Sequence, residues 1–226
     1  MNVYFVSGID TDIGKTVAVG MMARYLHRRG RRVITVKLIQ TGNIGFSEDL
    51  DRHRAMMGVG RFPEDEAGLT APAIFSFPAS PHFAAAREHR TVDLDAIRAA
   101  VEKVSANYDV VLLEGAGGLA VPLTEDLLTV DFAAERRYPL ILVTSGRLGS
   151  LNHTIMSIEM AVRRGMKLAG VVYNWSAGAD PEISADSRRM ILKYLNKYQQ
   201  PEILVELGKV AEPYPDTDFG PIFGER

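Results

Sequence analysis

The chain's 226 residues, 46% of them hydrophobic, fit one large domain with a substantial core, and a formal net charge of -2 gives no overall attraction to nucleic acid. The absence of cysteine excludes disulfides, thiolate catalysis and zinc sites built on sulfur. No apolar run reaches membrane-spanning length and no export signal is visible at the start, so we expect a cytoplasmic protein with no membrane partner.

Segments typical of strands and helices alternate along the chain. The apolar runs are short and unbroken, as in strands buried on both faces of a parallel sheet, and they predict strands at 3–6, 33–37, 110–113, 140–143, 168–173 and 203–205. Helical spacing predicts helices at 17–29, 51–57, 81–89, 94–105, 151–164 and 183–197. We expect a proline-rich loop at 61–81 and an irregular tail at 213–226. The alternation predicts a single α/β domain over 1–226, with a mostly parallel sheet and helices on both faces.

The stretch from Gly8 to Thr16 joins the first strand to the first helix and contains Gly14-Lys15-Thr16. In such a loop, backbone N–H groups face an anion, the lysine reaches the outer phosphates and the hydroxyl binds Mg²⁺. The loop is one residue longer than the standard pattern, because Ile9 stands six positions before the lysine, where that pattern has glycine. The sequence therefore predicts a P-loop NTPase-like fold that binds a nucleoside triphosphate.

Further charged side chains stand where strands end, and ligands of parallel sheets bind at the carboxyl ends of the strands. Lys37 closes the second strand and either reaches the surface or neutralises charge on a transferring phosphoryl group. Glu114 precedes a run of small residues and, opposite Thr16, suits Mg²⁺. Asp51 is a candidate for a further metal ligand, although spacing alone does not choose it over Asp49.

Three later segments are candidates for ligand contacts. Ser80 precedes a proline and His82, and it is either a helix N-cap or a substrate-binding hydroxyl. The loop at 146–153 runs into a helix whose N–H groups either hold a carboxylate or are simply capped. Asn174 follows a strand, where its amide either reads a base edge or forms a turn.

Together these motifs resemble those of the dethiobiotin synthetase family. The resemblance covers residue 3 to about 175, and its motifs are Gly8–Thr16, Lys37 with Thr41-Gly42, Ser80-Pro81-His82, Glu114–Gly118 with Pro122, Gly149 with Asn152-His153, and Gly170 with Asn174. It implies an ATP- and Mg²⁺-dependent ligase of biotin biosynthesis that carboxylates 7,8-diaminopelargonic acid with CO2. The ureido ring would close through a carbamate and a carbamic-phosphoric anhydride, with release of ADP and phosphate. The resemblance also implies a homodimer.

The resemblance also implies roles for individual residues. Lys15 and Lys37 would be catalytic, and Mg²⁺ would be held by Thr16, Asp51 and Glu114. The cofactor would be bound by Asp12, Ile13, Gly14, Lys15, Thr16, Val17, Asp51, Glu114, Gly115, Ala116, Gly117, Asn174 at the adenine, Trp175, Gly208, Lys209 and Val210. The substrate would be bound by Thr41, Ser80 and Gly117, and its carboxylate by Gly149, Ser150, Leu151 and Asn152 of a partner subunit.

Other nucleotide-binding classes fit less well. Dimeric switch ATPases of the partition or metal-insertion kind share the longer loop but typically have a lysine five positions before the loop lysine, where this chain has Asp10. Amide-forming relatives usually carry a glutaminase domain with a nucleophilic cysteine, and this chain has no cysteine. The ligase is therefore the prediction, and the switch ATPase is the alternative. Leu38, where the family usually has proline, and Trp175 are departures from the family's pattern.

Overall fold

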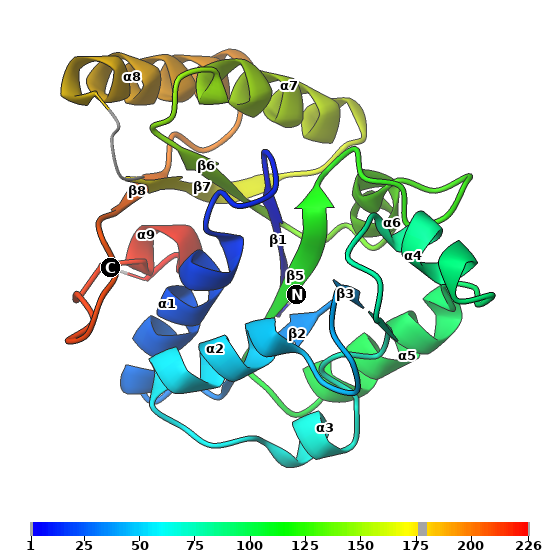
Figure 1. The fold of residues 1–226 in the computed structure, drawn as a ribbon. Coiled ribbons are helices and arrows are strands. Elements are labelled where there is room, and N and C mark those ends of the chain that lie inside the picture. The colour runs from blue at the N-terminus through cyan, green and yellow to red at the C-terminus, as the bar shows by residue number, and fades with distance from the viewer. Residues whose placement is uncertain (1, 176–179, 226) are drawn as a thin grey trace.

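A six-stranded parallel sheet lies between two layers of helices in the computed structural model, which describes residues 2–175 and 180–225 (Figure 1). From edge to edge, the strands are β2 (Val33–Lys37), β5 (Val110–Gly118), β1 (Val3–Gly8), β6 (Leu140–Ser145), β7 (Leu168–Asn174) and β8 (Leu204–Leu207). All neighbouring strands in this sheet run parallel. The predicted α/β fold with a mostly parallel sheet is confirmed. A separate parallel pair joins β3 (Gln40–Thr41) to β4 (Ile74–Phe75).

Helices cover both faces of the sheet, as predicted. All six residues of β6 are buried, because apolar layers press on it from both sides. One face carries α1 (Lys15–Arg28), α2 (Glu48–Met57) and α9 (Gly220–Phe223), and the other carries α6 (Thr129–Glu135), α7 (Ser150–Arg163) and α8 (Pro181–Lys197) (Figure 1). The remaining helices are α3 (Pro63–Glu66), α4 (Pro81–Arg87) and α5 (Leu94–Ser105).

Side-chain caps decide where two helices begin. The Ser47 hydroxyl accepts a hydrogen bond from the Leu50 N–H at 3.3 Å, so α2 begins at Glu48 rather than at Asp51. The first turn of α2 therefore includes Asp49. At α5, the Asp93 carboxylate caps the helix by accepting a hydrogen bond from the Ala96 N–H at 2.9 Å.

Several short elements were missed in the sequence. The expected loop at 61–81 contains α3 and β4, and α6 has no counterpart among the predicted helices. Strand β5 continues through Gly118, so the glycines after Glu114 are part of a strand. The expected irregular tail contains α9, and its described part, 213–225, packs on α1, where the Tyr25 hydroxyl donates a hydrogen bond to Asp218 at 2.9 Å. The ring of Phe219 meets Tyr25 edge to face.

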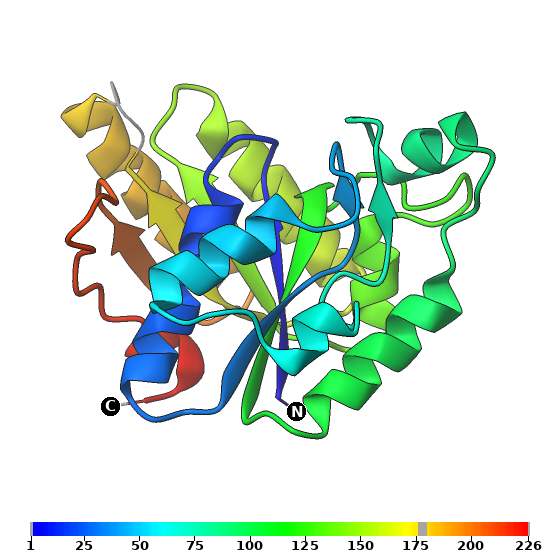
Figure 2. The same ribbon diagram turned by 60° about the horizontal axis from the view of Figure 1, so that its bottom comes forward.

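The carboxyl ends of β1, β2 and β5 meet at one edge of the molecule, where the chain turns from β1 into α1 and from β2 into β3 (Figure 2). The N-terminal end of β1 lies at the opposite edge (Figure 2). In the parallel register of β2 and β5, Lys37 stands opposite Glu114. The fold thus brings these two predicted site residues together. Among the described residues, no helix is both long and apolar enough to cross a membrane.

Candidate active site

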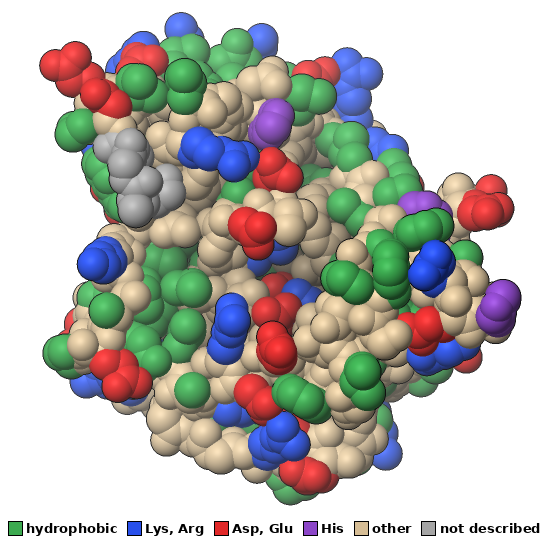
Figure 3. Space-filling model, viewed as in Figure 1, with side chains coloured by type: hydrophobic (Ala, Val, Ile, Leu, Met, Phe, Trp, Pro, Cys, Tyr) green, Lys and Arg blue, Asp and Glu red, His purple; other side chains and the backbone are tan. Residues whose placement is uncertain are grey.

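A cavity of about 700 Å³ opens at the carboxyl ends of the central strands. The loop after β1 forms one wall, and residues 78–81 lie across from it. Figure 3 shows the molecule hollowed at this place, with acidic and basic side chains gathered in the hollow. Of the predicted site residues, the cavity is lined by Asp12, Gly14, Lys15, Thr16, Val17, Lys37, Thr41, Ser80, Glu114, Ala116 and Gly117.

The phosphate loop is built around Gly14, whose φ of 87° lies in the left-handed region that favours glycine. A Cβ atom at this position would lie 2.3 Å from the Asn174 amide nitrogen, so glycine is also required for space. In the described part of the chain, no side chain caps the N-terminus of α1, which leaves its first N–H groups available to an anion. The Lys15 ammonium donates a hydrogen bond to the Asp10 carbonyl at 2.9 Å. Burial and the nearby Lys37 cation lower the pKa of Lys15, against the pull of Glu114.

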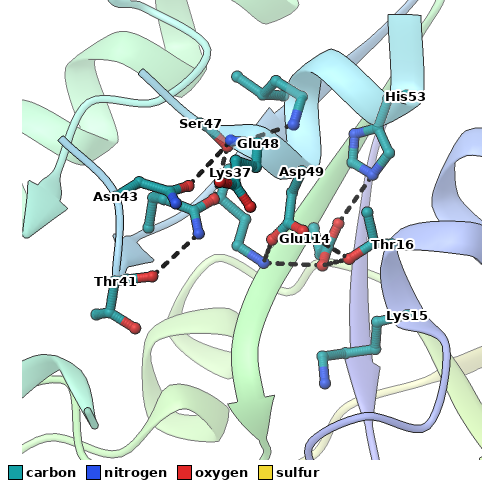
Figure 4. Close-up of polar contacts among 12 residues, drawn as sticks. Lys15, Thr16, Lys37, Thr41, Asn43, Ser47, Glu48, Asp49, His53 and Glu114 are labelled. Carbon is teal, nitrogen blue, oxygen red and sulfur yellow. Dashed lines mark hydrogen bonds and ion pairs between the residues drawn. The ribbon is translucent and has the colours of Figure 1, made fainter. Parts of the chain in front are cut away.

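Lys37 is held between two carboxylates on the floor of the cavity (Figure 4). Its Nζ lies 2.6 Å from Asp49 Oδ2 and 2.8 Å from Glu114 Oε1. Burial alone would lower the pKa of Lys37, but the two carboxylates outweigh it and the pKa is raised. For Glu114, burial would raise the pKa, but Lys37 and His53 outweigh it and hold this pKa well below its usual range. Both groups are therefore charged at neutral pH.

The Thr16 hydroxyl joins this cluster from the first turn of α1. Its Oγ1 lies 2.9 Å from Asp49 Oδ1 and 3.2 Å from Glu114 Oε1 (Figure 4). Among the described residues, no group of three or more His, Cys, Asp and Glu side chains could hold a metal ion. Mg²⁺ does not need one, because it commonly takes one or two carboxylates and completes its shell with water and substrate phosphates. A hydroxyl and two carboxylates beside a phosphate loop fit that requirement.

Asp51 does not belong to this cluster, contrary to our expectation. Its carboxylate accepts two hydrogen bonds from Arg61, each of 3.0 Å, and its side chain is 41% exposed. Residues two apart on a helix point to different sides, so only one of Asp49 and Asp51 can face the cavity. That residue is Asp49, which takes the place that the sequence analysis had assigned to Asp51.

Two buried polar residues behind the cluster were missed in the sequence. His53 is fully buried on α2, four residues after Asp49, and its Nε2 lies 3.1 Å from Glu114 Oε2. Arg54 is also buried and forms an ion pair with Asp65 at 2.8 Å. A usable signal existed, because residues four apart on a helix share a face. To use this spacing, one would have needed to know where α2 begins and that Asp49, rather than Asp51, faces the cavity.

The expected substrate residues fall into two groups. Thr41 and Ser80 line the cavity, and the Ser80 side chain makes no capping hydrogen bond although it precedes α4. The segment Gly149–Asn152 lies elsewhere, at the start of α7. Gly149 and Leu151 line a separate pocket with residues of α8, and the Ser150 hydroxyl lies 2.9 Å from that of Ser145. Within one chain, these residues do not reach the cavity.

Of the residues expected at the nucleotide base, Asn174 contacts the phosphate loop. The Asn174 amide donates a hydrogen bond to the Ile13 carbonyl at 2.8 Å, which ties the end of β7 to the loop. Trp175 donates its indole N–H to Glu206 at 2.7 Å, and Arg188 lies over its ring. Gly208, Lys209 and Val210 follow directly after β8. None of the residues in this group lines the cavity.

Comparisons with known proteins show which family the chain is similar to. A family model described as an AAA domain matches residues 2–210. The ATP-dependent dethiobiotin synthetase BioD 2 of Pasteurella multocida is 44% identical over 205 residues, which are 91% of this chain and 96% of the relative. The ATP-dependent dethiobiotin synthetase BioD of Chlorobaculum tepidum is 47% identical over 193 residues, which are 85% of this chain and 81% of the relative. For BioD 2 of Haemophilus influenzae, the identity is 48% over 172 residues, 76% of this chain and 90% of the relative.

Solved structures show likeness at the level of the fold. ParA of pNOB8 bound to nonspecific DNA has a TM-score of 0.57 at 12% identity, covering 98% of this chain and 90% of that chain. A ParA family ATPase from Chlorobium tepidum has a TM-score of 0.54 at 14% identity, covering 94% and 86%. At such low identities, these matches support the P-loop NTPase-like fold and nothing finer.

Proposed function

Because this chain belongs to the family of ATP-dependent dethiobiotin synthetases, we propose that it is the ligase that carboxylates 7,8-diaminopelargonic acid with CO2 and closes the ureido ring of dethiobiotin. One observation of the site supports this most strongly. The Lys37 ammonium lies on the cavity floor between Asp49 and Glu114, with the phosphate loop to one side and Thr41 to the other (Figure 4). A cation in this place lies between a triphosphate and a second substrate.

The reaction requires positioning and charge neutralisation more than proton transfer, since an amine and CO2 combine readily once they are held together. The first amine nitrogen bonds to the carbon of CO2 and loses a proton, giving a carbamate. A carbamate oxygen then bonds to the γ-phosphorus while the bond to ADP breaks. The second amine attacks the carbamoyl carbon, phosphate leaves with the bonding electrons, and a second proton is released as the ring closes.

The chain's own residues match these steps. Lys37 would neutralise the carbamate and then the transferring phosphoryl group, and Lys15 would hold the outer phosphates. Thr41 and Ser80, which line the cavity beyond Lys37, would contact the diamine end of the substrate. Thr16, Asp49 and Glu114 would hold Mg²⁺, which would supply positive charge to neutralise the outer phosphates.

The remaining nucleotide contacts follow from the family. Asn174 would meet the adenine, with Trp175 and residues 208–210 alongside. Asn174 already donates to the Ile13 carbonyl in the phosphate loop, so a base bound by this amide would be connected to the phosphates through the loop. We also infer a cytoplasmic location for the enzyme, as the sequence predicts.

The carboxylate site requires a second copy of the chain. Gly149–Asn152 lies away from the cavity of its own chain, while Leu148 beside it is 82% exposed and Met156 on α7 is 59% exposed. A homodimer that covers these apolar side chains would bring Asn152 of one copy to the cavity of the other, at the end away from Lys37 where the substrate carboxylate would lie. Mixing a Lys37→Gln chain with an Asn152→Ala chain should then restore roughly a quarter of wild-type activity, since half of the dimers are mixed and each has one intact site. No recovery after subunit exchange would refute the shared site.

Diamine-dependent phosphate release tests the proposed function. The protein would be incubated with ATP, Mg²⁺, bicarbonate and 7,8-diaminopelargonic acid, and with each component omitted in turn. We expect phosphate release only from the complete mixture. Rapid hydrolysis without the diamine would instead favour a switch ATPase, and no release in any mixture would sink the ligase assignment.

A further inference from the structure

We propose that His53 is a positioning residue that holds the Glu114 carboxylate in its working orientation, as the last member of a buried hydrogen-bond relay. The relay starts at Asp65 and passes through Arg54 and Thr35 to His53. The proposal rests on the proposed function only in taking Glu114 as part of the Mg²⁺–nucleotide site. It concerns residues of this chain that no family motif named above includes.

Burial requires the His53 ring to have partners. The ring is fully buried on α2 and faces one residue each of β2 and β5, so an unpaired ring nitrogen would cost free energy. Its Nδ1 lies 3.0 Å from Thr35 Oγ1, and its Nε2 lies 3.1 Å from Glu114 Oε2 (Figure 4). Glu114 Oε2 is buried as well, and His53 Nε2 is the polar atom that faces it in the part of the chain that the structure describes.

The directions of the hydrogen bonds follow from Arg54, because a guanidinium can only donate. Its Nη1 donates to Thr35 Oγ1 at 2.7 Å. The single Thr35 proton is then free to point at His53 Nδ1. With Nδ1 as the acceptor, the proton of a neutral ring lies on Nε2, and this nitrogen lies 3.1 Å from Glu114 Oε2. These two atoms form no hydrogen bond with any other group among the described residues.

The far end of the relay is fixed by Asp65. Its carboxylate accepts from Arg54 Nε at 2.9 Å and Nη2 at 2.8 Å, and also from the Thr70 hydroxyl at 2.6 Å. The Phe62 ring lies against the guanidinium, 4.7 Å from it. Arg54 is thus held by two parallel hydrogen bonds and an aromatic face, and cannot turn away from Thr35 without breaking them.

Because of the relay, the two carboxylate oxygens of Glu114 have different partners. His53 holds Oε2 from behind, and this leaves Oε1 facing Lys37 at 2.8 Å and Thr16 at 3.2 Å. The terminal torsion of a glutamate is broad and roughly two-fold, so a carboxylate without this support samples other orientations. Outer partners of this kind typically account for about 10- to 100-fold in metal affinity.

The test compares His53→Leu with His53→Gln. Leucine fills similar space with no donor, whereas glutamine places an amide N–H within reach of Glu114. The readout is the Mg²⁺ concentration that gives half-maximal binding of ATP, followed by titration calorimetry and needing no catalysis. We expect His53→Leu to raise this concentration by about 10- to 100-fold, with nucleotide binding without Mg²⁺ changed less than about twofold. Glutamine should recover most of the loss.

Met56→Leu is the matched control, because Met56 is buried on the same helix and packs near Gly20 of α1, away from the relay. We expect it to leave the Mg²⁺ requirement unchanged. If His53→Leu does not fold, Thr35→Val, which removes only the hydroxyl, takes its place. Equal behaviour of the Leu and Gln variants, or a loss that also appears without Mg²⁺, would overturn the proposal. Failure of the wild type to use the diamine would refute the ligase and leave this measurement intact.

Discussion

Exchanging Asp49 for asparagine should raise the Mg²⁺ requirement of the enzyme, whereas the same exchange at Asp51 should not. The two residues are two positions apart on α2 and are chemically identical. Asp49 Oδ1 lies 2.9 Å from the Thr16 hydroxyl, and its Oδ2 lies 2.6 Å from Lys37 Nζ. Asp51 pairs with Arg61 at the surface, where its side chain is 41% exposed.

The size of the difference follows from these surroundings. Asparagine in place of Asp49 would keep the shape of the side chain but remove one of the two negative charges beside Thr16. Loss of such support to a metal site typically changes affinity by about 10- to 100-fold, which corresponds to about 1.4 to 2.8 kcal/mol. At Asp51 the lost partner is an exposed ion pair, which water screens, so the change should stay within about twofold.

The assay is diamine-dependent phosphate release at saturating ATP, with Mg²⁺ varied. Asp49→Asn should shift the half-saturating Mg²⁺ concentration upward by the factor given above, and Asp51→Asn should overlay the wild type. The free energy of unfolding of each variant, measured in denaturant, controls for loss of structure. A larger shift at Asp51 than at Asp49, with both variants folded, would refute the assignment of Asp49 to the metal.

Two further predictions concern the charged pair at the cavity floor. Lys37→Gln should lower turnover by about 10²- to 10³-fold, the usual loss for one group that stabilises transition-state charge. ATP binding, measured by calorimetry, should change only a few-fold. An equal loss of ATP binding would show that Lys37 only holds the nucleotide. The pKa values of the Glu114 and Asp65 carboxyls lie below their usual range in the folded chain. Below about pH 5 the unfolded chain therefore takes up protons first, and the free energy of unfolding should fall as the pH falls. In denaturant titrations, Glu114→Gln should make the fall of the unfolding free energy with pH less steep. An unchanged pH dependence would contradict the lowered pKa of Glu114.

The sequence was most informative where a pattern is local. Burial on both faces sets the apolar runs of the strands in the main sheet, and burial on one face sets the spacing of the long helices. The existence of these elements was predicted correctly, although β5 runs on to Gly118 and α2 begins at Glu48. The short elements α3, β3, β4 and α6 are two to seven residues long and carry no readable period. They form because neighbouring segments pack on them, which local sequence does not encode.

The candidate site shows the same division. Lys37 and Glu114 could be named because each ends an apolar run, and the sheet register then places them opposite each other. Asp51 does not face the cavity, because the direction of a carboxylate on a short helix depends on where Ser47 starts that helix. His53 was missed because it lies on a helix and its partners, Thr35 and Glu114, lie on two strands that are distant from it in the sequence.

Incorporation of labelled carbon distinguishes the ligase from an enzyme that only hydrolyses ATP. The protein would be incubated with ATP, Mg²⁺, 7,8-diaminopelargonic acid and ¹³C-bicarbonate, and the products followed by mass spectrometry alongside phosphate release. We expect one labelled carbon in the ring of each dethiobiotin formed, with one phosphate released per ring. ATP hydrolysis with no label in a product of the diamine would contradict it.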